Sequence, residues 1–553
     1  MISDRIFWGG LLGIIGVYIA GLPATLMEND SAQFAVMAMR MVQENDFLSL
    51  WKGTEEYLDK PHMHYWLAAI SFKIFGFHAW AYRLPALLFT LLGGYSAYGL
   101  GKLLYNKNSG RMAALIFLSA QTIVLSVIDV RTDAVLTGSA VFAIWQLARY
   151  LEGGRTSGLL AGALGAGIAF STKGQIALLV IGLPLLCQLA YKRRWERLLN
   201  VKVLLALLVF ILAISPMLYA YYQQFDLHPE KVIRGRDHRS GVFFILWEQS
   251  FERLSGEGVG SNSSDYVFFF HTFLWVFLPW TLMGLAAFGT GFMAGWRRLQ
   301  GRIAKPAEVL TLGGIAFIFI IISFAQFKLP HYLNITIPLF AVLTAGFLDR
   351  QHREGRLRWL RRAAGVQAGI LGIVVLLTAL IVCWVFPWPL WAALLFLAVV
   401  LALAIVFYAR IREPLPRLVV LSVMACVVAN LVMNAWFYPE LLTYQAGSEL
   451  AAEWRREASA GQPIYKLSEE HTWALDFYSG SPALHTDLEG LRPGMWLFAR
   501  DEDLERLKKR QLGWDRQLTA DQFRITRLQA RFVNPATRDQ VLNRRHLVRI
   551  RPR

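Results

Sequence analysis

The 553-residue sequence has little charge and very little cysteine. Only 17% of its residues are charged, whereas 55% are hydrophobic and 13% are aromatic. A soluble chain of this length would need a more polar surface to cover about three or four domains, so the composition favours a protein that folds in a lipid bilayer. The three cysteines lie in apolar runs and have neither a metal-ligand spacing nor an evident disulfide partner: Cys187, Cys383 and Cys426.

Acidic residues are also scarce, with 39 Asp and Glu against 56 Lys and Arg, which gives a net charge of +17. Such an excess could serve nucleic-acid binding, but no soluble segment shows a basic face with interleaved aromatic residues. The basic residues instead cluster in short connectors between apolar runs, a pattern that orients membrane proteins with these connectors in the cytoplasm. The connectors lie at 107–111, 192–202, 297–305, 350–362 and 410–417.

The apolar runs of about 18 to 25 residues are long enough to cross about 30 Å of hydrocarbon. The first run could be a signal peptide, but its apolar core is too long and no small-residue cleavage site ends it, so we predict a membrane anchor. Cytoplasmic basic connectors require an even number of crossings between them. This rule is satisfied by thirteen predicted spans: 7–26, 81–105, 111–128, 133–151, 157–172, 175–192, 201–222, 268–290, 308–326, 332–349, 364–385, 389–409 and 416–438.

The same rule leaves the apolar stretch 62–77 outside the spans. The stretch is short and carries two histidines and a lysine among aromatic residues, with His78 directly after it, so it is predicted to be an interfacial or re-entrant helix. The alternative, an additional crossing, would invert everything downstream. With the N-terminus in the cytoplasm, the loops 27–80 and 223–267 and the C-terminal tail lie on the other side of the membrane.

The tail is predicted to form a separate domain. Polar helical stretches at 447–457 and 502–511 alternate with short strand-like runs at 464–467, 495–499 and 546–550. No internal repeat is evident. The sequence therefore predicts an all-α polytopic membrane domain over residues 1–439, followed by a small soluble α/β domain over residues 440–553.

The first external loop holds the first candidate for chemistry. Asp30 follows the first span directly and precedes residues 32–44, whose apolar stripe indicates an amphipathic helix on the membrane surface. Asp30 is either the N-cap of that helix, a carboxylate fixed for catalysis, or both. Further on, carboxylates, Lys60 and aromatic residues stand between two interfacial helices, where a lysine can meet a lipid phosphate.

Other short connectors map to the same side of the membrane. They contain Asp133 within 129–134, Lys173 within 172–174, and the run from Lys328 to Tyr332. Charged residues at span ends are often only boundary markers, but several such connectors at one face indicate a site. The loop 223–267 has five basic residues followed by a glycine- and serine-rich stretch, typical of a lid over an anionic headgroup or of a mobile solvated loop. The basic residues are Lys231, Arg234, Arg236, Arg239 and Arg253.

In these motifs the chain resembles the integral-membrane glycosyltransferases of the GT-C fold, in the branch of protein mannosyltransferases and bacterial 4-amino-4-deoxy-L-arabinose lipid A transferases. The motifs recur in order over nearly the whole chain: Asp30, Lys60-Pro61, Tyr65-Trp66, Trp80, Arg83-Leu84-Pro85, Asp133, Thr172-Lys173-Gly174, Leu278-Pro279-Trp280 and Lys328-Leu329-Pro330-His331-Tyr332. The chain departs from the family where Asn29-Asp30-Ser31 replaces a Pro-Asp-Glu, which removes a second carboxylate. Asp59 replaces a common Glu and keeps its charge.

The resemblance implies an inner-membrane enzyme with a periplasmic site that moves the amino sugar from undecaprenyl phosphate to a lipid A phosphate, a modification expected to give resistance to polymyxin-type peptides. It implies that Asp30 and Asp133 are catalytic. The donor phosphate would meet Lys60, Lys173 and Arg131. The remaining substrate contacts would be Tyr57, Asp59, Tyr65, His331 and Tyr332. The expected partners are the lipid-linked donor, lipid A and membrane lipids, and no nucleic acid.

No cofactor is certain. Carboxylates beside a phosphate call for a divalent cation or a basic cluster, and the sequence does not assign metal ligands. A single histidine in such a loop is more often a hydrogen-bonding partner than a metal ligand. The histidines in question are His62, His64, His78, His238, His271 and His331.

Two other functions stay open. A polyprenyl-phosphate-sugar protein glycosyltransferase would use the same donor chemistry. A transporter of lipid-linked sugar would suit the many spans, but transporter sites usually lie near the midplane on broken helices, whereas the charged groups of this chain lie in loops at one face.

Overall fold

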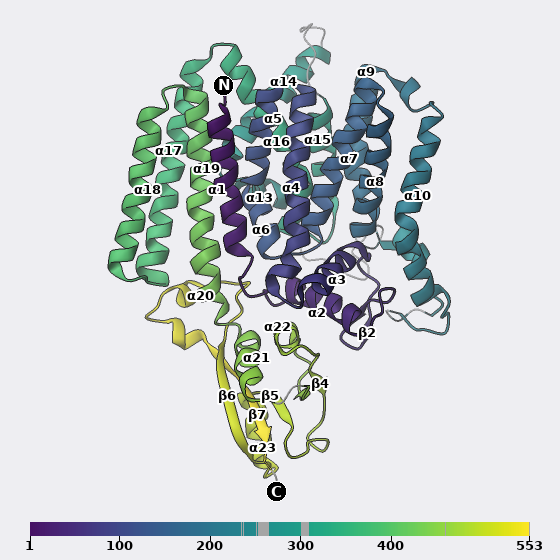
Figure 1. Ribbon diagram of the computed structural model, residues 1–553, viewed down its shortest axis with the longest axis vertical. Helices are drawn as coiled ribbons and strands as arrows, with labels where there is room; N and C mark the ends of the chain where they lie inside the picture. The colour runs from purple at the N-terminus through teal and green to yellow at the C-terminus, as the bar shows by residue number, and fades with distance from the viewer. Residues whose placement is uncertain are drawn as a thin grey trace.

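The computed structural model describes residues 1–233, 235, 237–249, 252, 265–299, 309–458 and 461–551. Long helices lie side by side along the long axis, and a small sheet domain extends from the end opposite the N-terminus (Figure 1). The bundle contains α1 (Asp4–Gly21), α4 (Ala79–Leu104), α5 (Lys107–Leu118), α6 (Gln121–Ile128), α7 (Asp133–Gly153), α8 (Thr156–Lys173), α9 (Ile176–Lys192), α10 (Lys202–Tyr221), α13 (Phe268–Val276), α14 (Thr281–Leu299), α15 (Leu310–Phe324), α16 (Ile337–Arg353), α17 (Leu357–Leu380), α18 (Leu390–Arg410) and α19 (Pro414–Val432).

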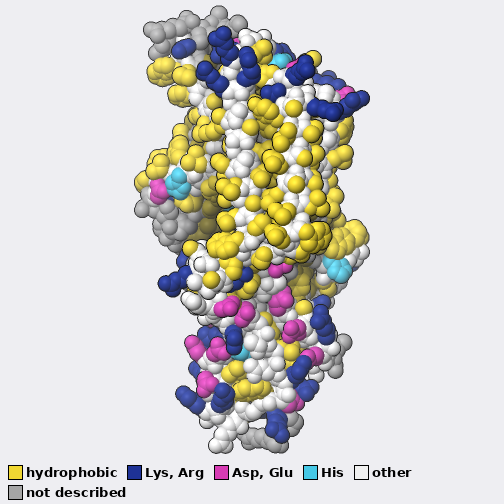
Figure 2. All heavy atoms as spheres, turned by 90° about the vertical axis from the view of Figure 1, so that its left-hand side faces the viewer, with side chains coloured by type: hydrophobic (Ala, Val, Ile, Leu, Met, Phe, Trp, Pro, Cys, Tyr) yellow, Lys and Arg dark blue, Asp and Glu magenta, His cyan; other side chains and the backbone are white. Residues whose placement is uncertain are grey.

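The bundle is that of a multi-pass membrane protein. Among the described residues, eight helices are long and apolar enough to cross a membrane by length and composition, and a ninth crossing results if the bent pair α5 and α6 forms one span. Figure 2 shows a broad apolar surface over the visible face of the bundle, with Lys and Arg side chains gathered at the N-terminal end. The predicted class is confirmed, and the count of thirteen spans stays a prediction.

Two helices of the bundle are interrupted, and the interruptions pack on each other. The chain bends by 51° between α5 and α6, and a second break at 277–280 separates α13 from α14. Trp280 Nε1 donates to Ser119 Oγ at 2.8 Å, and the amide of Gln121 donates to the carbonyl of Leu278 at 3.0 Å. The sequence predicted a single span over 268–290, and the structure divides this stretch between α13 and α14. The apolar composition continues across the break and therefore does not reveal it. The polar groups that the break frees are hydrogen-bonded by the other break.

Two helices follow α1 at the lower end of the bundle: α2 (Asp30–Gln43) and α3 (Met63–Phe75), joined through the short ladder of β1 (Trp51–Lys52) and β2 (Glu55–Glu56) (Figure 1). The α3 helix has 13 residues, too few to cross a bilayer. The predicted interfacial stretch 62–77 fits this helix. The α2 helix differs from prediction because residues 31–39 are all buried. The C-terminal domain covers the side that was expected to face solvent.

That domain begins beyond α20 (Tyr438–Leu442) and holds a five-stranded sheet of order β4-β3-β5-β7-β6. Strand β3 is parallel to β4 and β5, whereas β7 is antiparallel to β5 and β6. The elements are α21 (Ala446–Glu457), β3 (Ile464–Lys466), α22 (Trp473–Ser479), β4 (Leu484–His485), β5 (Trp496–Arg500), α23 (Asp501–Lys509), β6 (Trp514–Gln522), α24 (Ala530–Val533) and β7 (Asn543–Ile550). The α/β prediction is confirmed, although β6, a largely polar edge strand, carries no apolar alternation that could have revealed it.

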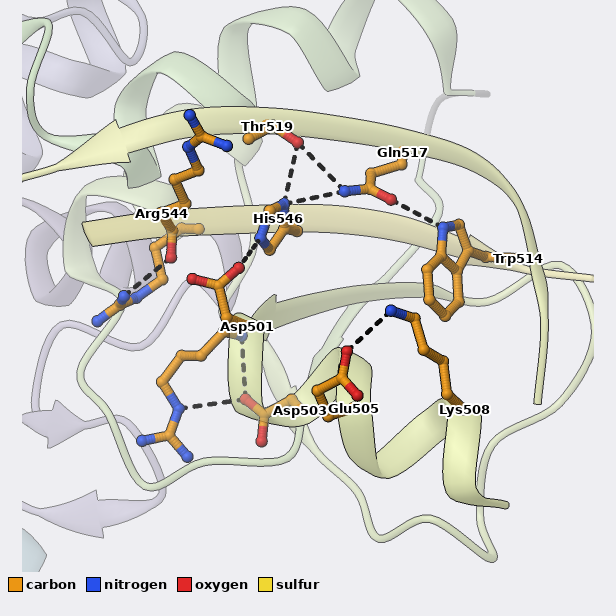
Figure 3. Close-up of polar contacts among 11 residues, drawn as sticks. Asp501, Asp503, Glu505, Lys508, Trp514, Gln517, Thr519, Arg544 and His546 are labelled. Carbon is orange, nitrogen blue, oxygen red and sulfur yellow. Dashed lines mark hydrogen bonds and ion pairs between the residues drawn. The ribbon is translucent and has the colours of Figure 1, made fainter. Parts of the chain in front are cut away.

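One buried histidine holds this domain together (Figure 3). His546 of β7 accepts hydrogen bonds at Nδ1 from Thr519 Oγ1 at 2.9 Å and from Gln517 Nε2 at 3.1 Å. Its Nε2 therefore carries the proton and donates to Asp501 Oδ1 at 2.8 Å. The contacts fasten the first turn of α23 to the two long strands.

Candidate functional site at the lower end of the bundle

Four segments that are distant in the sequence meet at the lower end of the bundle. They are the start of α2, the connector between α6 and α7, the end of α8, and a 3-10 helix, η4 (Pro330–Thr336), that leads into α16. Each brings a charged or polar side chain to the same place. The sequence had assigned these connectors to one side of the membrane, and in the structure they are in contact.

Asp133 lies at the centre of the cluster as the first residue of α7, and its side chain is only 3% exposed. Its Oδ1 accepts a hydrogen bond from Lys173 Nζ at 2.7 Å. Its Oδ2 lies 3.8 Å from Nε2 of His331. An unpaired carboxylate at this depth would be costly, so Asp133 and Lys173 depend on each other for their burial.

Arg131 links the two acidic loops, which are the loop between α1 and α2 that leads to Asp30 and the connector between α6 and α7 that holds Asp129. Its guanidinium pairs with Asp30 Oδ2 at 3.2 Å and with Asp129 Oδ2 at 3.0 Å. Burial alone would lower the pKa of Arg131, but the carboxylates of Asp129, Asp30 and Asp133 outweigh that effect and raise it. The guanidinium therefore stays charged and fixes the distance between the two loops.

The same guanidinium defines the tautomer of His331. Arg131 Nη1 lies 3.2 Å from His331 Nδ1, and a guanidinium can only donate, so Nδ1 accepts. In the neutral ring Nε2 then carries the proton and faces Asp133. His331 thereby joins the Arg131 group to the Lys173 group through one imidazole.

Asp30 is the most accessible acid of the cluster, with its side chain 43% exposed. The N-cap of α2 is Asn29, so Asp30 is the first residue inside the helix and its carboxylate points to Arg131. The N-cap alternative is wrong for this reason. A carboxylate that is held by one cation and still open to solvent can contact a ligand.

A first cavity, of about 120 Å³, lies beside Lys173, the partner of Asp133. Lys60 and Lys173 line it together with Tyr332, over whose ring the Lys173 ammonium lies at 4.9 Å from the centroid. The other walls are mostly aliphatic and come from α7, α9, α15 and η4: Leu136, Ile176, Leu179, Ile321, Ile322 and Ile335. The cavity combines a long apolar surface with two ammonium groups, as an anionic lipid requires.

A second cavity, of about 430 Å³, is lined by Asp129, Arg131, Asp133 and His331. Its wall is completed by α6, by residues 433–441 after α19, and by three residues of the C-terminal domain: Ile525, Thr526 and Leu528. The two cavities are thus linked by one ion pair, because Lys173 lines the first and its partner Asp133 lines the second.

A single buried arginine holds both acidic loops. Arg83 of α4 is fully buried and donates from Nε to the carbonyl of Ile128, the last residue of α6, at 3.0 Å. Its other nitrogens donate to carbonyls just beyond α1: Leu22 at 3.0 Å, Thr25 at 3.0 Å, and Ala24. One guanidinium therefore satisfies the end of two helices and sets the start of both loops.

Tyr82 and His64 fix the connector before α7 through two successive hydrogen bonds. Tyr82 donates its hydroxyl proton to the carbonyl of Val130 at 3.2 Å, so it accepts at 3.0 Å from Nε2 of His64. Burial lowers the pKa of His64 to about 4, which keeps the ring neutral. His64 thus acts as a hydrogen-bond donor, the ordinary role expected for a histidine here.

The structure brings together six of the residues proposed from the sequence: Asp30, Arg131, Asp133, Lys173, His331 and Tyr332. Lys60 joins Lys173 and Tyr332 in the first cavity. Tyr65 does not reach the cluster, because it is fully buried and packs edge-to-face on Phe34 and Tyr57. Asp59 contributes a backbone carbonyl that binds Gln249, another residue of the first cavity.

The predicted lid falls only partly on described residues. Lys231 pairs with Glu56 at 2.7 Å, and Arg239 pairs with Glu248 at 3.0 Å and with Glu252. Arg234, Arg236, Arg253 and the glycine-rich stretch lie outside the described residues. In the part of the chain that is described, no three His, Cys, Asp or Glu side chains are grouped as metal ligands would be.

Sequence reasoning missed two residues of the site. Asp129 pairs with Arg131, and its signal was its place in the same connector as Asp133. Arg83 was noticed only as part of a family motif, because its partners are backbone carbonyls that no side-chain pattern reveals.

Comparison with known proteins finds similarity to transferases of lipid-linked sugars. Residues 59–220 match the family model described as dolichyl-phosphate-mannose-protein mannosyltransferase. An undecaprenyl phosphate-alpha-4-amino-4-deoxy-L-arabinose arabinosyl transferase of Edwardsiella ictaluri is 25% identical over 376 residues, which cover 66% of this chain and 63% of that protein. Its namesake from Yersinia enterocolitica is 23% identical with the same coverage. The chain thus spans less than two thirds of the relatives that it matches.

The solved structures agree with these matches. The crystal structure of ArnT from Cupriavidus metallidurans bound to undecaprenyl phosphate superposes with a TM-score of 0.71 at 16% identity, covering 99% of this chain and 98% of that one. Its apo form gives 0.69 at 18% identity, with 93% and 96% covered. The GT-C fold with a small C-terminal sheet domain, and the resemblance drawn from the sequence, are confirmed.

Proposed function

We propose that the protein is a glycosyltransferase that moves 4-amino-4-deoxy-L-arabinose from undecaprenyl phosphate to a phosphate of lipid A. The observation that carries this proposal is the ion pair between Lys173, which lines an apolar cavity together with Lys60, and Asp133, which lines a larger cavity walled by both domains. The relatives named above carry this activity in their names. The product would protect a bacterium against polymyxin-type cationic peptides.

The proposed location is the bacterial inner membrane, with the site and the C-terminal domain in the periplasm. Basic side chains gather at the N-terminal end of the bundle, as expected of a cytoplasmic end (Figure 2). The sheet domain and α2, whose first residue is Asp30, lie at the opposite end (Figure 1). A donor and an acceptor that are both lipids would reach such a site from the outer leaflet.

The first cavity is the proposed donor site. Its aliphatic walls suit a polyprenyl chain, and Lys60 and Lys173 suit the phosphate at the end of that chain. As the bond between the anomeric carbon and the phosphate oxygen breaks, the electron pair stays on the phosphate. The two ammonium groups stabilise this charge, and no proton has to be supplied.

The acids of the cluster suit the sugar. The ring gains oxocarbenium character as the leaving group departs, and its amino group is a cation, so a nearby carboxylate stabilises both. Asp30 is accessible enough for this contact, whereas Asp133 is buried against Lys173 and His331. We therefore assign contact with the sugar to Asp30 and the positioning of the cations to Asp133.

The second cavity is the proposed acceptor site. Arg524 and Arg527 are exposed on either side of the cavity-lining residues Ile525 and Thr526, which suits a phosphorylated acceptor. A phosphate monoester is largely ionised at neutral pH, so its oxygen can attack the anomeric carbon without a general base. A new bond from carbon to phosphate oxygen replaces the old one, and undecaprenyl phosphate leaves.

Transfer to protein is the second candidate, because the matching family model describes protein mannosyltransferases. A hydroxyl acceptor would need Asp30 or Asp133 as a base. Purified protein in liposomes, given labelled lipid-linked sugar with lipid A and an unfolded protein together, separates the candidates. Label in lipid A supports our proposal, and label only in protein contradicts it.

The variant Asp30→Asn tests the assignment within the same assay. We expect transfer to fall about 10³-fold, the size of effect typical for a lost electrostatic contact in the transition state. Binding of undecaprenyl phosphate should be unchanged, because Asp30 does not line the first cavity. Full transfer activity in this variant would remove Asp30 from the mechanism.

A further inference from the structure

The segment between α1 and α2 is bound by the C-terminal domain on successive residues. The amide of Leu26 donates to the hydroxyl of Tyr478 at 2.9 Å, and its carbonyl accepts from Gln445 Nε2 at 2.9 Å. The amide of Glu28 donates to Gln445 Oε1 at 2.7 Å. One buried side-chain amide thus bonds both sides of the segment, as a neighbouring strand would, across more than 400 residues of sequence.

The side chain of Glu28 adds a fourth contact. Its Oε2 accepts from the backbone amide of Ala474, in the first turn of α22, at 3.1 Å. We call these four hydrogen bonds the 26–28 latch. All of its donors and acceptors on the C-terminal side belong to Gln445, Ala474 and Tyr478.

The latch ends two residues before Asp30, at a strained position. Asn29 has φ 74° and ψ −137°, a backbone conformation that residues other than glycine rarely adopt. Such a conformation persists only when its surroundings hold it on both sides. On the far side, α2 packs against Trp473, Ala474 and Phe477 of the C-terminal domain. The direction of the backbone from Asn29 into Asp30 therefore depends on that domain.

We infer that the C-terminal domain positions the catalytic carboxylate, and that Glu28, Gln445 and Tyr478 are positioning residues that hold Asp30 against Arg131. This inference rests on the proposed role of Asp30. It gives the domain a part in the reaction beyond walling the second cavity. Loss of the latch should lower turnover while leaving the lipid donor bound, because the described residues that line the first cavity all lie outside the C-terminal domain.

The latch also has a defined response to pH. Burial raises the pKa of Glu28 to about 7; the amides of Ala474 and Trp473 oppose this rise, and the carboxylates of Asp476 and Glu470 add to it. Tyr478 also faces the segment, with Arg83 and Glu449 as its own charged neighbours. A raised folded pKa means that the protonated acid favours the latched state. The stabilisation is complete below about pH 4.5 and is lost as the pH rises through about 7.

The test compares Glu28→Ala, Gln445→Leu and Tyr478→Phe with the full-length protein in liposomes. Hydrogen exchange of the amides of Leu26 and Glu28 reports the latch, and kcat and the Kd of undecaprenyl phosphate report function. For Glu28→Ala and Gln445→Leu we expect exchange about 10-fold faster and kcat about 10-fold lower at an unchanged donor Kd. Tyr478→Phe should show a smaller effect in the same direction, because it removes one bond.

Glu28→Gln separates positioning from loss of structure. The amide keeps the bond to Ala474 and cannot ionise, so we expect wild-type kcat and latch exchange that is less dependent on pH between 6 and 8.5. Glu505→Ala and Glu505→Gln, on the exposed side of α23, are the matched controls and should change neither exchange nor kcat.

The outcomes are distinguishable. Faster exchange with unchanged kcat in both Glu28→Ala and Gln445→Leu would overturn the inference. A loss of kcat in Glu28→Gln equal to that in Glu28→Ala would also overturn it. If Asp30→Asn retains full transfer while the latch variants lose it, the proposed role of Asp30 is wrong and the latch acts on another group.

Discussion

The two cavities are linked by the Lys173–Asp133 pair but are built differently. The first is formed by the bundle and by Lys60 and Gln249 of two external loops, with largely aliphatic walls and two ammonium groups. The second is larger, has acids, an arginine and a histidine among its lining residues, and needs the C-terminal domain to complete its wall. Damage to the C-terminal domain should therefore affect the acceptor and the geometry of Asp30, whereas donor binding should not depend on that domain. The following variants test this division.

Lys173→Met should have the largest effect, because Lys173 lines the first cavity and also holds Asp133, which lines the second. We expect kcat/KM to fall about 10³-fold through loss of the phosphate contact and of site order. The variant also leaves a buried carboxylate unpaired, which costs about 3 to 5 kcal/mol of stability. Thermal unfolding measures this cost.

The double variant Lys173→Met with Asp133→Asn is the control for that loss of stability. It should regain most of the unfolding temperature but none of the activity. Recovery of activity in the double variant would mean that Lys173 serves only to neutralise Asp133.

Lys60→Met should affect the donor alone, because Lys60 lines only the first cavity. Loss of one charged contact to a phosphate should raise the Kd of undecaprenyl phosphate about 10- to 100-fold. The acceptor KM should stay within about twofold. Binding of the labelled lipid to protein in nanodiscs measures the first value, and an increase in the acceptor KM alone would contradict the assignment of the cavities.

The double variant Arg524→Ala with Arg527→Ala should affect the acceptor and not the donor, and its effect should be smaller than that of Lys60→Met. These side chains are exposed, so we expect the KM for lipid A to rise about 3- to 10-fold, less so at high salt, with an unchanged donor Kd. Arg510→Ala, at the exposed end of α23, is the matched control. Equal effects of Arg510→Ala would show that only the net charge of the domain matters.

The smallest expected effect is a dependence on pH of the stability of the C-terminal domain. Burial raises the pKa of Asp476 to about 7, although hydrogen bonds from the amide of Ala483 and from Thr472 oppose the rise. A raised folded pKa stabilises the domain at low pH, and this stability is lost as the pH rises through about 7.

Between pH 6 and pH 9 we expect the unfolding temperature to fall by about 2 to 4 °C in the wild type, and by less in Asp476→Asn. The acceptor KM should rise over the same pH range, while donor binding should not. A larger loss of donor binding than of acceptor affinity would contradict the assignment of the donor to the first cavity and the acceptor to the second.

Much of the bundle and its charged cluster could be predicted from the sequence. Span ends are marked by abrupt changes in hydropathy, and basic connectors fix the side of each loop, so Asp133, Lys173 and His331 were assigned to one face before any geometry was known. Lys60 was singled out by its place between two interfacial helices, and Arg131 lies in the same connector as Asp133. These signals are local in the sequence. Because each span ends at a surface of the membrane, residues at span ends on the same side lie at a similar depth.

Contacts between a side chain and a distant backbone could not be predicted. Gln445 and Arg83 bind carbonyls, which every residue carries, so their partners leave no mark in the sequence. The burial of α2 was missed for the same reason, because the covering residues Trp473 and Phe477 lie more than 400 positions away. The breaks within the apolar runs at 119–120 and 277–280 were hidden by their composition.

The buried guanidinium of Arg83 has one more consequence, which concerns the surrounding bilayer. Membranes differ in thickness, and helices adapt by tilting, which would move the ends of α1 and α6 independently. Because one planar group binds carbonyls from both ends, the two acidic loops must shift together. The distance between Asp30 and Asp133 is therefore set by bond angles within one side chain and by the Arg131 pairing, so it should stay constant as the lipid composition changes.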